Sequence, residues 1–364
     1  MRVLLCGGGS AGHVNPALAI GETIQRNLPG SQIAYVVTST GIENKLVNYK
    51  KYSINVKGFK RSASISNFKS AFLLMDAIKK SKKIIKDFCP DVIIGTGGYA
   101  TYPVVYAGQK MGIKTVLHES NACPGKAIKM LENKVDLIFT NFAESEKFFK
   151  NKNRAKIIRV GNPLRNGFEE YDKEELKERL NIKEKYVILC YGGSLGAEKI
   201  NNSAIEIIEN YIRYQENIRF IFATGKRSYQ DVLESLKNKR LNRLKNVSVS
   251  EYIYDMPEKM AIADIVISRS GAMTISELAA SKKCSILIPS TNVTNNHQMK
   301  NAKALEKEGA AIVVPESETY TLIDIIKDLI SNNTKRTKME KNINKFHFPD
   351  AKKNIYMKLI NLLN

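Results

Sequence analysis

The sequence lacks several features that would place it in a simple class. Its 364 residues include no tryptophan, and its cysteines are dispersed without a C-x-x-C pair. The cysteines are Cys6, Cys89, Cys123, Cys190 and Cys284. An odd, scattered set argues against a disulfide framework or a zinc site and is typical of a reducing cytoplasm. No apolar run approaches the ~18 residues that span a membrane, and the start at residues 1–6 is too short for a signal peptide.

Acidic residues are scarce relative to basic ones. The chain carries 57 Lys and Arg against 36 Asp and Glu, a net charge of +21, with 25 basic and 10 acidic side chains in residues 1–161. Such an excess indicates an anionic partner, which is a nucleic acid, an anionic membrane surface or an anionic substrate. A Lys-, Asn- and Ile-rich genome gives the same overall composition, but it does not explain why the excess is concentrated in the first half.

Short apolar runs rich in β-branched residues alternate with helical patterns along the whole chain. This alternation predicts an α/β fold with parallel sheets covered on both faces. We expect two Rossmann-like domains facing across a cleft, covering residues 1–161 and 162–345, with a final helix in 346–364 that packs back on the first domain. The expected strands are 3–6, 33–38, 92–95, 115–118, 137–140, 157–160, 186–191, 219–224, 247–251, 265–268, 285–289 and 311–314.

A weak internal repeat marks the start of each half. Residues 2–12 (RVLLCGGGSAG) resemble residues 186–196 (YVILCYGGSLG), each a buried strand, a glycine-rich turn and a helix. Glycines let backbone N–H groups approach an anion at a helix N-terminus. Two alternatives compete with anion binding. The first loop fits an NAD site, but no acidic residue closes the next strand, since Glu43 comes late. The second fits a hydrolase nucleophile elbow at Ser194. However, the first loop has the same shape with Ser10, which favours anion binding by the backbone over a nucleophile.

Further polar segments follow other predicted strands. They are 95–103 (GTGGYATYP), 118–121 (HESN), 268–277 (SRSGAMTISE) and 295–301 (NNHQMKN). In parallel sheets such segments line the ligand crevice, although each also fits an ordinary polar loop. Glu277 can accept hydrogen bonds from a vicinal diol. His13 opens the first helix, where the dipole disfavours imidazolium, so it is a candidate base. No two Asp stand two apart, which favours chemistry without a metal or other cofactor.

Taken together, these motifs resemble the MurG family of UDP-N-acetylglucosamine–N-acetylmuramyl-(pentapeptide) pyrophosphoryl-undecaprenol N-acetylglucosaminyltransferases, which have the GT-B fold. The resemblance covers nearly the whole chain. It rests on GGGSAGHVNPALA (7–19), GTGGYATYPV (95–104), HESNACPGK (118–126), GNPLR (161–165), YGGSLGAEKIN (191–201), EYIYDM (251–256), SRSGAMTISEL (268–278) and NHQMKNA (296–302).

The resemblance implies an inverting transfer of N-acetylglucosamine from UDP-N-acetylglucosamine to the C4 hydroxyl of the muramyl group of an undecaprenyl-diphosphate-linked acceptor in peptidoglycan synthesis. His13 is the suspected base, and no metal or other cofactor is expected. The implied donor-binding residues are Ser10, Ala11, Gly12, Asn121, Arg165, Ser194, Ile253, Ala272, Met273, Thr274, Ile275, Ser276, Glu277 and Gln298. The loops implied for the acceptor diphosphate contain Gly9, Gly97, Gly98 and Tyr99.

The resemblance also gives a role to the basic first half. Residues 60–88 interleave Lys and Arg with apolar residues, as in a helix that lies on an anionic leaflet. We expect a membrane-facing surface and a peripheral location at the cytoplasmic face of the cell membrane, with no nucleic-acid partner. The alternative is an ordinary amphipathic helix packed on the core. The residues expected at the surface are Phe72, Leu73, Met75, Lys79, Lys80, Lys82 and Lys83.

Other functions remain open on sequence grounds alone. A lipid glycosyltransferase with another acceptor, such as diacylglycerol, shares the same fold. A nucleotide-sugar epimerase needs no acceptor at all. A basic nucleic-acid binder fits the charge, but the aromatic motifs of RNA-binding sheets and a basic helix-turn-helix are not evident.

Overall fold

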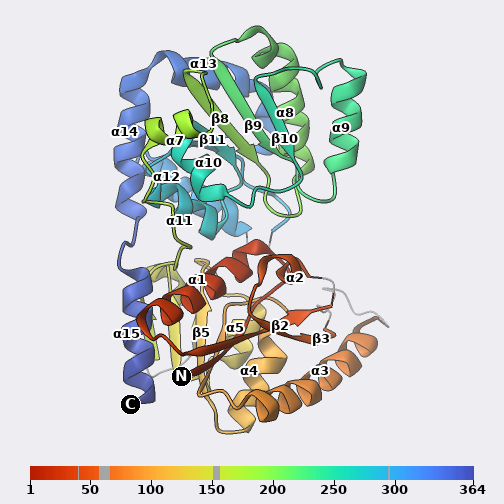
Figure 1. Ribbon diagram of the computed structural model, residues 1–364, viewed down its shortest axis with the longest axis vertical. Helices are drawn as coiled ribbons and strands as arrows, with labels where there is room; N and C mark the ends of the chain where they lie inside the picture. The colour runs from red at the N-terminus through yellow and green to blue at the C-terminus, as the bar shows by residue number, and fades with distance from the viewer. Residues whose placement is uncertain (40, 57–65, 151–155, 294–295) are drawn as a thin grey trace. The chain divides into compact units, whose positions relative to one another are not determined.

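The protein is described by a computed structural model that covers residues 1–39, 41–56, 66–150, 156–293 and 296–364. The chain divides into two compact units (Figure 1). Unit 1 contains Met1–Arg165 and Phe348–Asn364, and unit 2 contains Asn166–His347. Within the described ranges, no helix is long and apolar enough to cross a bilayer.

Unit 1 is built on a parallel sheet with the strand order β3-β2-β1-β4-β5-β6-β7. Its central strand β1 pairs in parallel with both neighbours, so that Leu4 lies between Ala34 and Ile93. Strands buried on both faces need apolar residues at every position rather than alternate ones. The strands are β1 (Arg2–Cys6), β2 (Gln32–Thr38), β3 (Lys50–Ile54), β4 (Val92–Gly95), β5 (Lys114–Glu119), β6 (Leu137–Thr140) and β7 (Ile157–Arg159).

Helices of unit 1 follow the strands in the pattern of a doubly wound fold. They are α1 (Ala11–Asn27), α2 (Glu43–Leu46), α3 (Ser66–Phe88), α4 (Thr101–Lys110), α5 (Lys126–Leu131), α6 (Ala143–Glu146) and α15 (Ala351–Leu363). The last of these returns from the far end of the sequence and packs beside α1 (Figure 1). Its Ile355 and Leu359 are buried in the same core cluster as Ile24. The predicted return of the final helix to the first domain is therefore confirmed.

A glycine allows the returning chain to pack tightly where unit 1 ends. Gly161 has a φ of +85°, and a Cβ there would lie 2.4 Å from the Cβ of Phe348. The guanidinium of Arg159 lies over the Phe348 ring, 5.0 Å from its centroid. A side chain at position 161 would push the segment at Phe348 away from the end of β7. Glycine is therefore needed here for packing as well as for its positive φ.

Unit 2 repeats the arrangement with the order β10-β9-β8-β11-β12-β13, again with parallel pairing. Its strands are β8 (Tyr186–Tyr191), β9 (Ile218–Ala223), β10 (Val247–Ser250), β11 (Ile265–Ser268), β12 (Cys284–Leu287) and β13 (Ile312–Val313). Its helices are α7 (Lys173–Arg179), α8 (Glu198–Asn210), α9 (Tyr229–Asn238), α10 (Met256–Ile262), α11 (Ala272–Ala280), α12 (His297–Lys307), α13 (Leu322–Ser331) and α14 (Asn333–Ile343).

The predicted fold class of two Rossmann-like α/β units is confirmed, and one strand was missed. Strand β3 has the sequence KKYSI and lies at the edge of its sheet, where only Ile54 is buried. An edge strand has one neighbour and an exposed face, so its residues need not form a continuous apolar run. Hydrophobic pattern alone therefore could not find it.

Candidate functional site

Two glycine-rich loops of unit 1 pack main chain against main chain. They follow the adjacent strands β1 and β4, and the Gly8 amide donates to the Gly97 carbonyl oxygen at 3.2 Å. A Cβ on Gly98 would lie 2.0 Å from the carbonyl oxygen of Gly8, and Gly98 has a φ of +81°. Only glycine fits there. The structure therefore brings together the two loops predicted to bind the acceptor diphosphate, with Tyr99 beside them and 60% exposed.

The first of these loops leads directly into helix α1. Ser10 is the N-cap, but its side chain makes no capping hydrogen bond. The first turn of a helix leaves its amides without helical acceptors and carries the positive end of the helix dipole. Ala11 and Gly12 begin this turn, so their amides can receive an anion. The Gly9 amide is already engaged, since it donates to Oε2 of Glu43 at 3.3 Å.

The ring of His13 has a defined orientation and tautomer. Its Nδ1 lies 3.1 Å from the carbonyl oxygen of Thr96. Because a carbonyl oxygen only accepts, Nδ1 carries the proton and Nε2 keeps its lone pair. Burial lowers the pKa of His13, and the Thr96 contact only partly offsets this. The side chain is thus neutral near pH 7 and has the form that a general base requires.

Asn121 is held at the end of β5 by a buried carboxyl group that the sequence analysis did not assign. Oε1 of Glu119 accepts from the Asn121 amide at 2.8 Å and from its Nδ2 at 3.0 Å. Oε2 accepts from the Gly125 amide at 2.8 Å. Burial raises the pKa of Glu119 more than these donors lower it. The signal was available in the sequence, since Glu119 lies two residues before Asn121 at a strand end, but the donors that hold it come from folding.

Arg165 is the last residue of unit 1, and in this structure it pairs with α1. Its Nε lies 3.4 Å from Oε1 of Glu22, and its side chain is 42% exposed. An exposed pair of this kind contributes little to stability, so the guanidinium can exchange Glu22 for another anion. Its predicted contact with the donor diphosphate stays a prediction.

Unit 2 has its own main-chain contact at the loop after β8. A Cβ on Gly225 would lie 2.0 Å from the Gly196 amide nitrogen, and both glycines have positive φ values. Ser194 lies in this loop, and its carbonyl oxygen accepts from the Lys226 amide at 3.4 Å. Asn201, which was not predicted, is buried, and its Nδ2 donates to the Thr224 carbonyl oxygen at 2.9 Å. It ties α8 to the loop after β9, which packs against the loop that contains Ser194.

The run 272–277 forms the first two turns of α11, directly after β11. Gly271 is the N-cap and offers no side chain there. The side chains of Ala272, Met273 and Ile275 are buried in the core, so these residues would contact a ligand through their main chain. Thr274 is partly exposed, and Ser276 bonds back to the Ala272 carbonyl oxygen at 3.2 Å. The helix thus offers its N-terminus to an anion at the carboxyl edge of the sheet.

Glu277 is a buried carboxyl group whose pKa is raised to about 8 by burial alone. It is 8% exposed. The buried Tyr191 hydroxyl lies near enough for Glu277 to raise its pKa further, after burial itself. A desolvated carboxyl group is unfavourable in a resting fold, and hydroxyl donors from a ligand would satisfy it. This environment fits the ribose contact, which stays a prediction.

The remaining predicted residues of unit 2 lie in neighbouring loops. Oε1 of Gln298 accepts from the Ser290 amide at 2.9 Å, and its carbonyl oxygen accepts from the Ser270 hydroxyl at 2.8 Å. Gln298 therefore ties α12 to the loop that precedes α11. Ile253 follows β10, and its side chain is buried, so any contact it makes with a base would come from its main chain.

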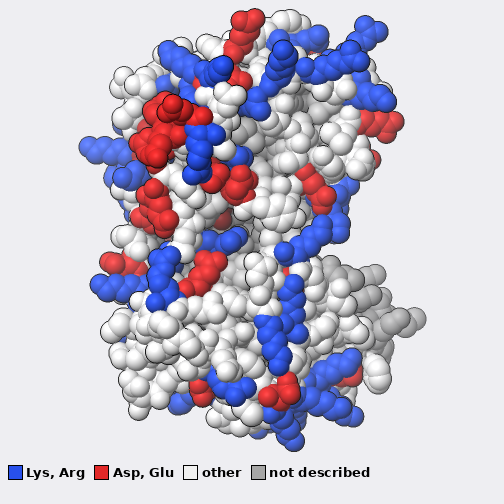
Figure 2. Space-filling view, viewed as in Figure 1, with Lys and Arg blue, Asp and Glu red and all other residues white. Residues whose placement is uncertain are grey.

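The predicted membrane surface lies on α3, whose two faces differ. Ala77, Ile84 and Ile85 are buried in the core, as an ordinary amphipathic helix would have them. Phe72 and Met75, in contrast, are 74% and 71% exposed. Lys and Arg side chains gather over this helix in the lower right of Figure 2. Leu73 and Lys80 are partly exposed, and Lys79, Lys82 and Lys83 are exposed.

The basic residues at positions 60 and 61 lie outside the described residues. Two exposed lysines of α3 form one stripe with Phe72 and Met75, because residues three and four apart share a helix face. The stripe begins at Phe72 and Met75 and continues through Lys79 and Lys82. Lys80 is partly neutralised by Asp76 at 2.9 Å.

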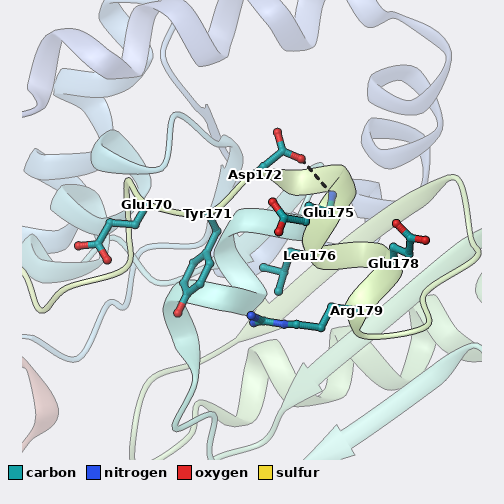
Figure 3. A pocket seen from close by; sticks show the side chains of 7 residues that line it. All are labelled: Glu170, Tyr171, Asp172, Glu175, Leu176, Glu178 and Arg179. Carbon is teal, nitrogen blue, oxygen red and sulfur yellow. Dashed lines mark hydrogen bonds between the residues drawn. The ribbon is translucent and has the colours of Figure 1, made fainter.

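A separate hollow in unit 2 contains none of the predicted site residues. Its volume is about 460 Å³, and Figure 3 shows its lining around α7. Oδ1 of Asp172 caps α7 by accepting from two amides at 3.0 Å. Arg179 lies over the Tyr171 ring, 5.7 Å from its centroid, and bonds Glu258 at 2.7 Å. These contacts give the residues structural roles. No group of three metal-binding side chains gathers anywhere in the described ranges, this hollow included.

We predict that Glu277→Gln stabilises unit 2 in a pH-dependent way. The folded-state pKa of about 8 lies well above the usual glutamate value of 4.5. The protonated carboxyl group of the wild type therefore makes its full contribution to the stability of the fold below pH 4.5. That contribution is lost as the pH rises through 8 and the buried group ionises. The variant should match the wild type at pH 5 and exceed it at pH 9, with a Tm higher by a few degrees. Scanning calorimetry at the two pH values measures this.

Glu308→Gln is the matched control, because Glu308 is exposed in the same unit. It should leave the Tm unchanged at both pH values. A Glu277→Gln difference that does not grow between pH 5 and pH 9 would contradict the desolvated carboxyl group.

Comparisons with known proteins agree with this architecture. Residues 3–140 match the glycosyltransferase family 28 N-terminal domain, and residues 187–355 match the glycosyltransferase family 28 C-terminal domain. A curated relative from Acetivibrio thermocellus is 39% identical over 98% of this chain and 96% of its own length. That relative is named UDP-N-acetylglucosamine–N-acetylmuramyl-(pentapeptide) pyrophosphoryl-undecaprenol N-acetylglucosamine transferase.

Solved structures show the same fold at lower identity. MurG from Acinetobacter baumannii aligns with a TM-score of 0.69 and 23% identity over 99% of both chains. The UDP-GlcNAc 2-epimerase from Neisseria meningitidis aligns with a TM-score of 0.68 and 18% identity over 99% of this chain and 100% of its own. The fold is therefore shared with an epimerase, and the assignment rests on sequence. With both family 28 domains and 39% identity to a full-length relative, the chain belongs to the MurG family of glycosyltransferases.

Proposed function

We infer that this chain transfers N-acetylglucosamine from UDP-N-acetylglucosamine to undecaprenyl-diphosphate-linked N-acetylmuramyl-pentapeptide. The observation that carries the inference is 39% identity over 98% of the chain to a relative named for this reaction. The positions of the buried polar groups, such as Glu119 and Glu277, also support this function. They lie at the carboxyl edges of two parallel sheets, where ligands bind in such folds.

Unit 2 holds the donor. The N-terminus of α11 stabilises the diphosphate, and Glu277 accepts hydrogen bonds from the ribose. The main chain at Ile253 reads the uracil, and Gln298 reads the sugar hydroxyls. Support comes from the raised pKa of Glu277 and from the side-chain-free cap at Gly271. Donors aimed at the departing diphosphate are worth more in a water-poor site than in solution.

Unit 1 binds the acceptor through its paired glycine loops and activates the hydroxyl. Nε2 of His13 takes the proton from the C4 hydroxyl as its oxygen attacks the anomeric carbon. The bond from that carbon to the diphosphate oxygen breaks, and UDP leaves with the electron pair. A single displacement of this kind inverts the anomeric centre. The Nδ1–H contact with Thr96 at 3.1 Å supports this base role, and the charge of UDP is met by amides without a metal ion.

A label-transfer assay tests the function directly. Radiolabelled UDP-N-acetylglucosamine is offered with either the prenyl-diphosphate muramyl-peptide or diacylglycerol, in the presence of EDTA. Label should move to the first acceptor alone. Label on diacylglycerol, or epimerised sugar nucleotide without transfer, would contradict the proposal. Activity restored only by added Mg²⁺ would contradict the metal-free step.

His13→Ala in the same assay isolates the base. The expected loss in kcat is about 10²- to 10⁴-fold, with the fold intact by circular dichroism. Because burial lowers the pKa of His13, wild-type kcat/KM should hold down to pH 6.5 and fall only below it. His347→Ala, a histidine of unit 2 that pairs with Glu169, is the control and should keep both rate and profile.

The chain docks peripherally on the cytoplasmic face of the cell membrane, where its lipid-linked acceptor lies. The exposed stripe of α3 supports this, since Phe72 and Met75 would enter the leaflet beside Lys79 and Lys82. Burying a large apolar side chain contributes about 1.5–3 kcal/mol, and each nearby basic group about 1 kcal/mol. Together these contributions to the free energy are enough for reversible binding to the membrane.

Phe72→Ser/Met75→Ser should weaken binding to phosphatidylglycerol vesicles by about tenfold or more, from the apolar area withdrawn. Sedimentation with vesicles measures the partition. Tyr320→Ser is the matched control, since Tyr320 is 76% exposed in unit 2 and should not change binding. Equal partition of the double variant and the wild type would exclude α3 as the docking face.

A further inference from the structure

Glu43 is a buried acidic residue that the proposed reaction leaves without a role. It begins the short helix α2 and is 0% exposed. Acidic residues are seldom fully buried unless their oxygens are satisfied. Its position beside the Gly7–Gly12 loop therefore calls for a physical reason.

The two oxygens of Glu43 join two different segments. Oε1 accepts from the Thr38 amide at 2.9 Å and from the Thr38 hydroxyl at 2.5 Å, which anchors the side chain to the end of β2. Oε2 accepts from the Gly9 amide at 3.3 Å. A Cβ on Gly8 would lie 2.7 Å from Oε1, so the carboxyl group occupies the space that this glycine leaves.

Packing does not hold the loop at Gly9. Gly9 has a φ of +87°, and nothing lies within 4 Å of where its Cβ would be. Hydrogen bonds fix the main chain of the loop instead. The Gly8 amide donates to Gly97, the Gly9 amide donates to Glu43, and the Tyr35 hydroxyl donates to the Gly7 carbonyl oxygen. With these two amides turned to protein acceptors, the next ones, at the start of α1, are left to meet an anion.

We propose that Glu43 is a positioning residue that shapes the Gly7–Gly12 loop for the diphosphate of the acceptor. It touches no substrate itself. It acts by holding the Gly9 amide so that the amides at Ala11 and Gly12 face the ligand together. The inference rests on the proposed function, because it takes the acceptor diphosphate as the ligand of this loop. The family resemblance implies donor contacts for Ala11 and Gly12, and the inference assigns their amides to the acceptor instead.

Glu43→Gln changes only one end of this bridge. The carboxamide oxygen takes the Oε1 position, because two Thr38 donors converge there. The carboxamide nitrogen then faces the Gly9 N–H, and two donors cannot bond. Thr38→Val is the matched control, because it removes a buried hydrogen bond to the same carboxyl group and leaves the Gly9 contact in place.

The experiment measures KM for the lipid-diphosphate acceptor and for UDP-N-acetylglucosamine in the full chain. Glu43→Gln should raise the acceptor KM about tenfold, the effect of losing one hydrogen bond to a charged group. The donor KM should stay within about twofold. Thr38→Val should leave both KM values unchanged, and Glu43→Asp, which keeps the charge on a shorter arm, should give an intermediate acceptor KM.

Equal rises in both KM values, or the same acceptor effect from Thr38→Val, would overturn the proposal, since general loosening explains either. Binding of inorganic pyrophosphate, followed by amide chemical shifts of residues 9–12, separates this inference from the proposed function. If the wild type transfers no sugar, the function fails, yet pyrophosphate should still bind more weakly to Glu43→Gln. Unchanged pyrophosphate binding would sink the positioning role, and the Asp variant carries the same test if the Gln variant does not fold.

Discussion

Both units depend on a place where main chain touches main chain with no room for a side chain. In unit 1 a Cβ on Gly98 would lie 2.0 Å from the carbonyl oxygen of Gly8, and in unit 2 a Cβ on Gly225 would lie 2.0 Å from the Gly196 nitrogen. In each unit the loop after the first strand packs against the loop of an adjacent strand, but that strand lies on opposite sides of the first strand in the two units. In unit 1 it meets the loop after β4, and in unit 2 the loop after β9. These contacts fix backbone amides at the carboxyl edge of each sheet, which is what phosphate binding needs.

The ionisable groups beside these loops fall into two kinds. Glu119 and Glu43 are buried carboxyl groups whose oxygens meet donors from the protein itself. They fix main chain or an amide side chain, and they need no ligand. Burial raises the pKa of Glu119 as well, but protein donors to its oxygens partly offset this rise. Glu277 and His13 differ, because burial is the sole cause of the raised pKa of Glu277, and because His13 bonds the protein through Nδ1 and keeps the lone pair of Nε2. Groups left in this state store free energy that a ligand or a transferred proton can release. The contrast separates residues that hold the site from residues that act in it.

The sequence predicted the architecture well, since buried parallel strands such as VLLC in β1 are continuous apolar runs. It missed β3, which lies at an edge and begins with two lysines. The motifs also placed His13 at the start of a helix, Asn121 at the end of a strand and Glu277 within the second turn of a helix. What it could not supply is the partner of each group. Glu43 was weighed only as a late acidic residue for a nucleotide site, because its partner Gly9 lies 34 residues away. Likewise, only the fold shows that Phe72 is exposed while Ile84, on the same helix, is buried.

The central claim is that the amides of unit 2 hold the nucleotide and those of unit 1 do not. Hydrogen exchange with and without UDP, read at single-peptide resolution, tests it most directly. The account predicts slower exchange in residues 192–197 and at the start of α11, with residues 7–12 unchanged. Protection of residues 7–12 by UDP, with residues 192–197 and α11 unaffected, would contradict it.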